Sequence, residues 1–203
     1  TPFRTKFEED LPKYRGPMGL GVISDFEDQP LLIGSRHGTY AIVTVGRVSN
    51  ADALAAEALR GNGTHFSEIK GNAFNPTEVV ASLINRGETL VEGLRLVHER
   101  VEGSCSVLLL TREGIYASRD GLGRTPVVLG RKRDARAVTL ESCAFPNLGF
   151  EVERELGPGE IVRVTAEGVE TLSPPGDRTQ ICAFLWIYYG YPASSYEGIN
   201  VEA

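Results

Sequence analysis

The chain has 203 residues, of which 41% are hydrophobic and 24% charged, and its formal net charge is −6 at pH 7. These values are typical of a globular domain and exclude a disordered chain. The acidic balance argues against a nucleic-acid-binding surface, and no apolar run approaches the ~18 residues of a membrane span. Because the sequence does not open with a signal peptide, we expect a single cytoplasmic domain.

The N-terminal part predicts three strands. Residues Gly16–Ser24 alternate small and apolar side chains, as strands do when another layer packs closely on them. Two more strands are predicted at Pro30–Gly34 and Thr39–Gly46. Arg36–Gly38 separates these two strands and has the chemistry of a hairpin turn.

Three helices are predicted in the middle of the chain. The first follows Asn50, a plausible N-cap, and stops at Gly61. The second opens with Pro76 at the first helical position and ends at Gly87. The third spans residues 88–101 and has a single apolar stripe.

The C-terminal part predicts three hairpins, which pair residues 104–111 with 114–120, 125–132 with 135–142, and 160–165 with 169–172. The turn of the third hairpin is predicted at Ala166–Gly168. The apolar run Ile181–Tyr189 fits a strand or a helix, and its aromatic and β-branched content favours a strand or irregular core packing. The helices are grouped and do not alternate with the strands. This order favours an α+β fold of antiparallel sheets with a segregated helix layer.

Few residues stand out as reactive on their own. Cys105, Cys143 and Cys182 are too few and too spread for a disulfide framework or a zinc site, and their apolar neighbours predict buried thiols. His98, between charged and apolar residues of the third helix, is predicted to be solvated. Thr1 is a candidate N-terminal nucleophile with its own amine as base. We expect no metal and no cofactor.

Seven strings, taken in chain order, resemble segments of class II glutamine amidotransferases. Together with EGINV after the last string, they run from about Tyr14 to Val201, and this last part is most similar to amidophosphoribosyltransferases. The strings are YRGPMGLGV, VTVGRVSNADAL, NPTEVVASLI, SRDGLGRTPVVLG, TLESCAF, LGPGEIVRV and ICAFLWIYYGYPASS. The first string is similar to two family segments, His-Arg-Gly-Pro/Gln and Lys-Gly-Met-Gly-Leu, and both alignments remain open.

The resemblance implies the N-terminal nucleophile hydrolase fold, a four-layer αββα sandwich with two antiparallel sheets between helix layers. It implies a single amidotransferase-like domain over residues 1–203, without the phosphoribosyltransferase domain of the similar enzymes. A glutamine-like small molecule is the implied ligand. The implied protein partner is a second copy of the chain or a transferase-like protein, whereas no nucleic acid or membrane is expected.

The resemblance also assigns positions in the substrate pocket, and at several of them the functional side chain of the family is replaced. Val45 stands where the family has the asparagine that donates to the oxyanion, and Gly46 still offers a backbone N–H. Pro76 replaces the aspartate that accepts the glutamine amine. Arg15 and Gly16 match the His-Arg-Gly segment. No string matches the nucleophilic cysteine strand or the arginine that holds the glutamine carboxylate.

The chain therefore keeps the family's residues at turns and in the core. It does not keep the side chains that catalyse the reaction or bind glutamine. This pattern predicts a degenerate domain without glutaminase activity and with a structural, regulatory or ligand-sensing role. Two alternatives remain. One is an active glutaminase that supplies ammonia to an amidophosphoribosyltransferase-like enzyme of purine biosynthesis. The other is an amidohydrolase that uses Thr1.

Overall fold

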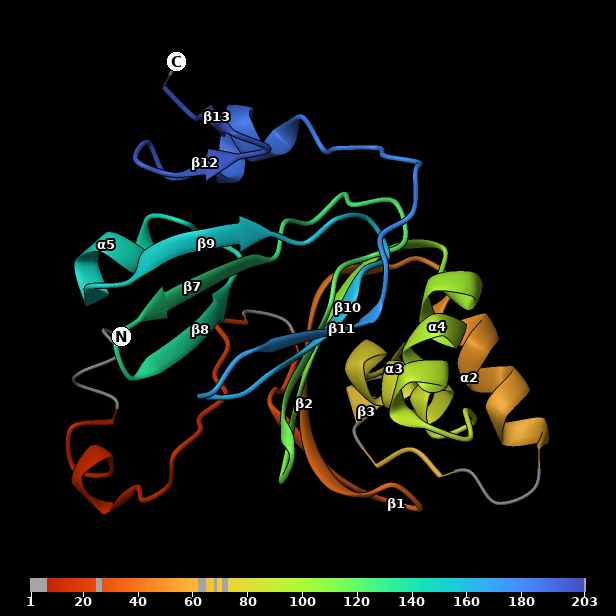
Figure 1. Cartoon of the computed structure of the whole chain (residues 1–203). Helices are drawn as coiled ribbons and strands as arrows, with labels where there is room; N and C mark the ends of the chain where they lie inside the picture. Colours follow the sequence, from red (N-terminus) through yellow and green to blue (C-terminus); the bar gives the residue numbers. More distant parts are fainter. Residues whose placement is uncertain (1–6, 25–26, 62–64, 68, 71–72, 203) are drawn as a thin grey trace.

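The computed structural model describes residues 7–24, 27–61, 65–67, 69–70 and 73–202. Two antiparallel sheets form its centre (Figure 1). The larger sheet has six strands in the order β1-β2-β5-β6-β10-β11, and the smaller has three in the order β8-β7-β9. The predicted α+β arrangement of two antiparallel sheets with helices is confirmed.

The six-stranded sheet consists of three hairpins laid side by side. Its strands are β1 (Leu31–Ser35), β2 (Gly38–Val48), β5 (Gly103–Thr111), β6 (Gly114–Ser118), β10 (Ile161–Val164) and β11 (Val169–Ser173). The β1–β2 turn falls at the predicted Arg36–Gly38 segment, and Ser35 pairs with Gly38. Local turn signals thus position these hairpins correctly.

The smaller sheet and the short ribbons come from the remaining strands. They are β7 (Val128–Lys132), β8 (Ala135–Thr139) and β9 (Glu151–Glu155), then β3 (Ile69–Lys70) with β4 (Ala73–Phe74), and β12 (Ser195–Tyr196) with β13 (Ile199–Asn200). The short helix α5 (Ala144–Leu148) covers the outer face of the smaller sheet. Its Phe145 ring takes the place of a side chain at Gly130, where a Cβ would lie 2.7 Å from the ring.

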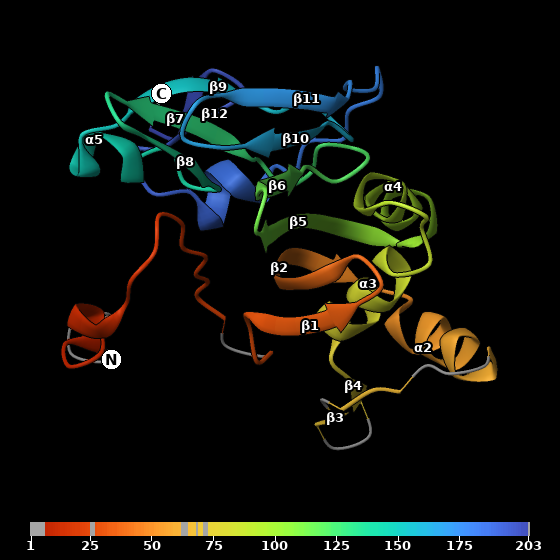
Figure 2. The same ribbon diagram turned by 60° about the horizontal axis from the view of Figure 1, so that its bottom comes forward.

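Three helices cover the outer face of the six-stranded sheet, as Figures 1 and 2 show. They are α2 (Ala51–Arg60), α3 (Pro76–Ile84) and α4 (Leu90–Arg100). The Asn75 side chain caps α3 by accepting from the Thr77 N–H at 2.9 Å, and Thr89 caps α4. Asn50 precedes α2 as predicted, but its side chain bonds to Arg100 and Glu102 instead of capping the helix.

The core lies on both faces of the six-stranded sheet. Along β5, Val107 and Leu109 belong to the cluster beneath the helices. The intervening Leu108 faces the other way and packs on the cluster between the sheets, around Leu129 and Val162. This alternation is the period of two that strand geometry imposes. The two sheets therefore form a sandwich with a helix layer outside the larger one.

Several expectations for individual segments are wrong. Gly16–Ser24 is irregular and not a strand, because an alternating pattern needs a neighbouring strand to complete its hydrogen bonds. The run Ile181–Tyr189 is not a buried strand: it contains a π-helical turn, Leu185–Tyr189, with much of its apolar surface exposed. Among the described residues, no helix has the length and apolarity needed to cross a membrane.

The reactive side chains also differ from expectation. His98 is half-buried and not solvated, because Ser118 of the neighbouring sheet lies within hydrogen-bond distance of its ring. Cys105 is buried as predicted, whereas Cys143 and Cys182 are half-buried. The last two lie beside surface segments, so their apolar sequence neighbours did not predict their exposure.

Candidate functional site

A hollow of about 300 Å³ lies between the two sheets and beside residues 21–23, and we call it the inter-sheet cavity. Val43, Val45 and Leu108 line it from the six-stranded sheet, and Val138 and Leu140 line it from the side of the smaller sheet. Such a volume is at the lower end of those that hold small ligands. Its walls are mainly aliphatic, so it favours an apolar occupant.

Two polar side chains in the wall of this cavity already have partners. Ser106 accepts a hydrogen bond from the Asp120 N–H at 3.1 Å. Glu141 Oε2 accepts from Ser194 Oγ at 2.7 Å and from the Tyr196 hydroxyl at 2.8 Å. Burial and the Glu141 carboxylate raise the pKa of Tyr196, so this phenol stays protonated and donates. Both groups serve the packing of the domain.

Val45 and Gly46, matched by sequence to the oxyanion site, lie at the end of β2. The Val45 side chain lines the inter-sheet cavity and has no polar atom. Gly46 has φ +132°, and a Cβ there would lie 2.1 Å from the Ser104 carbonyl oxygen. Position 46 therefore requires a glycine, because β2 approaches β5 too closely for a side chain.

Pro76 lies on the opposite, helix-covered face of the six-stranded sheet. It is the first residue of α3, and the next residue, Thr77, is fully buried. The Thr77 hydroxyl donates to Glu27 Oε2 at 3.0 Å and lies 2.6 Å from Thr44 Oγ1. Because the Thr77 proton points to Glu27, Thr44 is the donor in the second bond. Val45 and Pro76 thus do not share one cavity in this arrangement.

We call Glu27, Gln29, Thr44, Asn75 and Thr77 the polar cluster. Gln29 accepts from the Thr44 N–H at 2.8 Å, and its amide lies 3.4 Å from Glu27 Oε2. Asn75 donates to the Asp28 carbonyl at 3.1 Å. The cluster joins the segment before β1 to β2 and to the start of α3, and its single carboxylate accepts from Thr77 and Gln29 within the cluster.

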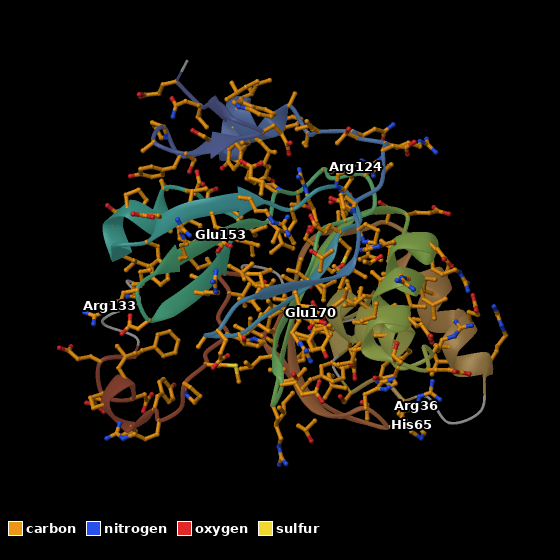
Figure 3. The ribbon with its side chains drawn as sticks, in the orientation of Figure 1. Arg36, His65, Arg124, Arg133, Glu153 and Glu170 are labelled. Atoms are coloured by element: carbon orange, nitrogen blue, oxygen red, sulfur yellow. The ribbon has the colours of Figure 1, made fainter. Side chains whose placement is uncertain are left out.

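The remaining sequence candidates lie elsewhere. The Arg15 guanidinium turns back on its own loop, where it donates to the carbonyls of Tyr14, at 2.9 Å, and Pro12. Gly16 is exposed in the same loop, at φ +147°. Arg36, which the sequence predicted only as a turn residue, lies at the far end of the molecule (Figure 3) and donates to backbone carbonyls between α3 and α4. Thr1 lies outside the described residues.

A second hollow, of about 270 Å³, contains His98, Cys105, Asp120 and Arg178 in its wall. The His98 ring lies 2.7 Å from Ser118 Oγ, and burial lowers its pKa. Burial raises the pKa of Cys105 to about 12, so this thiol is not a nucleophile at neutral pH. The described part of the chain contains no cluster of three metal-ligating side chains.

The sequence did not predict the polar cluster, nor that Ser106 lines the inter-sheet cavity. Glu27 and Thr77 are 50 residues apart, and no local pattern connects them. Glu141 did carry a signal, because it belongs to the TLESCAF string. Its partners Ser194 and Tyr196 come from the C-terminal segment, and only the fold brings them together.

Comparison with known proteins agrees with this architecture. Residues 20–145 match the family model of the glutamine amidotransferase domain. The amidophosphoribosyltransferase of Bacillus subtilis is 32% identical over 207 residues, covering 96% of this chain and 42% of its own length. That of Archaeoglobus fulgidus is 27% identical, covering 92% of this chain and 47% of its own. The chain thus spans less than half the length of these relatives.

A solved structure has the same fold. The glutamine phosphoribosylpyrophosphate amidotransferase of B. subtilis, complexed with ADP and GMP, superimposes with a TM-score of 0.74 at 30% identity. The match covers 86% of this chain and 38% of the other. The predicted N-terminal nucleophile hydrolase fold is therefore confirmed, and the chain belongs to the glutamine amidotransferase domain family.

Proposed function

We propose that this chain is an amidotransferase-like domain without glutaminase activity, with a structural, regulatory or ligand-sensing role. The observation that carries the proposal is the environment of Val45. At the position matched to the oxyanion-binding asparagine, an aliphatic side chain points into an aliphatic cavity. It offers no hydrogen-bond donor to a developing negative charge.

The position matched to the glutamine-binding aspartate supports the same conclusion. Pro76 has no carboxylate, and it forms the first turn of α3. The nearby carboxylate of Glu27 accepts from Thr77 and lies on the helix-covered side. A glutamine would therefore find no carboxylate for its α-ammonium group at this matched position.

The expected cost of these losses is large. Loss of one oxyanion donor reduces the rate about 10²–10³-fold. Loss of a charged partner for the substrate ammonium weakens binding by roughly a few kcal/mol more. Together they predict a large loss of glutamine hydrolysis, even with a nucleophile present.

The test is ammonia release from glutamine by the purified chain, with the B. subtilis amidophosphoribosyltransferase as positive control. We expect no ammonia release above the buffer background. We also treat the chain with a glutamine-analogue alkylator and measure its intact mass, and we expect no adduct whose formation glutamine prevents. An adduct that glutamine does not prevent counts as nonspecific labelling, since Cys143 and Cys182 are half-buried. Ammonia release that the alkylator abolishes would overturn the proposal.

Ligand sensing and a purely structural role give different results in a thermal unfolding experiment. A rise of the melting temperature with glutamine, without ammonia release, identifies a sensor. An unchanged melting temperature favours a structural role in an assembly. The expected location in the cytoplasm and a link to purine biosynthesis follow from the same family relationship and belong to this proposal.

A second candidate retains hydrolysis, and Glu27 is the observation in its favour. Its carboxylate lies next to the start of α3, within 3.0 Å of the residue after Pro76. If ammonia is released, Glu27→Gln should abolish it, and Thr1→Ala should do so if Thr1 is the nucleophile. Thr5→Ala is the matched control for Thr1, because it makes the same change four residues along the chain.

A further inference from the structure

A larger hollow adjoins the inter-sheet cavity. It has a volume of about 470 Å³, and we call it the outer hollow. Gly21, Leu108 and Val138 belong to the walls of both hollows. The outer hollow borders residues 134–138, and the inter-sheet cavity borders residues 138–141. The two hollows therefore follow one another along β8 and meet at these three shared residues.

A loosely held segment, residues 17–23, lies over both hollows. Its residues 17–21 line the outer hollow, and residues 21–23 line the inter-sheet cavity. Only Leu20 and Val22 are half-buried, whereas the rest of the segment is exposed. No hydrogen bond joins the segment to another described residue, and Figure 1 shows it as an open red-orange trace beside β8. The segment can therefore move aside without breaking hydrogen bonds, which joins the two hollows into one groove.

The walls of this groove are aliphatic over most of its length. The shared residues Leu108 and Val138 lie where its two parts meet. The other aliphatic residues are Val43, Val45, Val127 and Leu140 in the inter-sheet cavity, and Ile115 and Val164 in the outer hollow. Together the two hollows reach the volume of ordinary small-ligand sites. A hydrocarbon chain that lies along the groove would leave water for an apolar environment.

Arg136 provides a polar group at the outer end of the groove. It lies half-buried in the wall of the outer hollow, and its Nη1 donates to Glu153. Its Nε is buried and has no acceptor among the described residues. A buried N–H without an acceptor is destabilising, and native structures usually supply one. An acceptor that enters the outer hollow would therefore make a hydrogen bond that no described residue makes.

The other charges of this wall do not select the sign of a ligand. Arg112 is exposed there and forms no ion pair within the described ranges. Glu113, Asp134 and Glu167 lie in the same wall, so positive and negative charges nearly balance. The Nε of Arg136 therefore determines which polar group fits, because an N–H donor bonds to an oxygen acceptor and not to an ammonium group. A carboxylate is the strongest such acceptor for a guanidinium group.

We propose that the groove binds a linear aliphatic carboxylate. The carboxylate accepts from Arg136 and attracts Arg112 at the outer end, and the aliphatic chain extends toward the inter-sheet cavity once residues 17–23 move aside. This ligand differs chemically from glutamine, so the inference goes beyond the proposed function. The two can fail separately, because one is measured as ammonia release and the other as binding of a carboxylate that contains no nitrogen.

The experiment is isothermal titration calorimetry of the purified chain with octanoate, hexanoate and octanol. We expect saturable binding of one octanoate per chain. Hexanoate should bind about tenfold more weakly, because it buries two methylene groups fewer. Octanol should also bind at least about tenfold more weakly, because its hydroxyl oxygen is an uncharged acceptor. Absence of saturable octanoate binding, or equal affinities for octanoate and octanol, would overturn the proposal.

Arg136→Met removes the Nε donor and keeps an unbranched side chain. It should weaken octanoate binding at least about tenfold and abolish the preference for octanoate over octanol, which a merely structural role would not change. Arg112→Met, at an exposed residue that the fold does not need, should change this preference in the same direction. Arg60→Met, at an exposed arginine in the last turn of α2, is the matched control and should bind octanoate like the unmodified chain.

The displacement of residues 17–23 has its own pair of variants. Leu20→Ala shortens a half-buried anchor of the segment, so the segment should move aside more readily and octanoate should bind more tightly. Ile23→Ala makes a similar change at a side chain that is 98% exposed, and it should leave the affinity unchanged. Equal affinities of these two variants would contradict the displacement. Equal effects of Arg136→Met and Arg60→Met would contradict the assignment of the carboxylate to Arg136.

Discussion

Gly46 lies where β2 approaches β5 too closely for any side chain. Its φ of +132° and the position of the Ser104 carbonyl both exclude a Cβ. We expect Gly46→Ala to lower the free energy of unfolding by about 2 kcal/mol or more. Gly34→Ala in β1, where an added Cβ meets no atom within 4 Å, is the control and should stay within about 0.5 kcal/mol. Urea denaturation measures both, and equal effects would contradict the close approach of the two strands.

His98 gives the stability a defined pH dependence. Burial lowers its pKa in the folded chain, against the opposing attraction of Asp120 and Glu99. In the unfolded chain the imidazole titrates near 6.5. Below that pH the unfolded state therefore binds a proton that the folded state resists. The contribution of neutral His98 to the free energy of unfolding is therefore present above pH 6.5 and is lost as the pH falls below this value.

The measurement is the melting temperature at about one pH unit above and below this value. The melting temperature should decrease less on acidification in His98→Gln than in the unmodified chain, because glutamine does not titrate. His65→Gln, at an exposed histidine, should retain the full decrease. An unchanged decrease in His98→Gln would show that other groups cause it.

At the scale of elements, the Glu141 carboxylate connects residues 194–196 of the C-terminal segment to the chain just after β8. Glu141 accepts from both Ser194 and Tyr196. In Glu141→Ala the buried Tyr196 hydroxyl loses its acceptor, which costs about 2–3 kcal/mol. We expect faster hydrogen exchange over residues 194–200. Glu151→Ala is the control, because its ion pair with Arg131, at 3.7 Å, is exposed and contributes little. Equal exchange in the two variants would contradict this role of Glu141.

Elements with local signals could be predicted from the sequence. The turns at Arg36–Gly38 and Ala166–Gly168 separate alternating runs, and both became hairpins. Asn75 and Pro76 mark the start of α3, because a side-chain cap and a proline suit the first turn. In each case a few neighbouring residues determine the backbone, so no knowledge of distant contacts is needed.

Other features depend on contacts that no local pattern contains. The segment Gly16–Ser24 alternates like a strand, but no described strand completes its ladder. The run Ile181–Tyr189 is apolar enough for a core, yet its turn lies at the surface, where the Trp186 ring packs edge-on against Tyr196. The polar cluster joins Glu27 to Thr77 across 50 residues. These three features follow from tertiary packing, which overrides the local sequence preference.

At the scale of the whole molecule, the two faces of the six-stranded sheet are packed unequally. Beneath the helices, Leu83, Leu94 and Leu109 are at most 2% exposed. Between the sheets, Leu108 is only half-buried and borders the inter-sheet cavity. Most of the rigid core therefore lies beneath the helices, and the inter-sheet face retains the open volume in which a ligand would bind.

Adjacent residues of β5 test this asymmetry, because they make the same change on opposite faces. Leu109→Ala opens a new void in a filled core and should cost about 3 kcal/mol of unfolding free energy. Leu108→Ala enlarges a space that already exists and should cost about 1 kcal/mol, mainly the transfer of the lost methyl groups. Urea denaturation with unchanged m-values measures both. Equal costs would mean that the inter-sheet cavity is filled in solution, and the site of a small ligand would then have to be sought elsewhere in the domain.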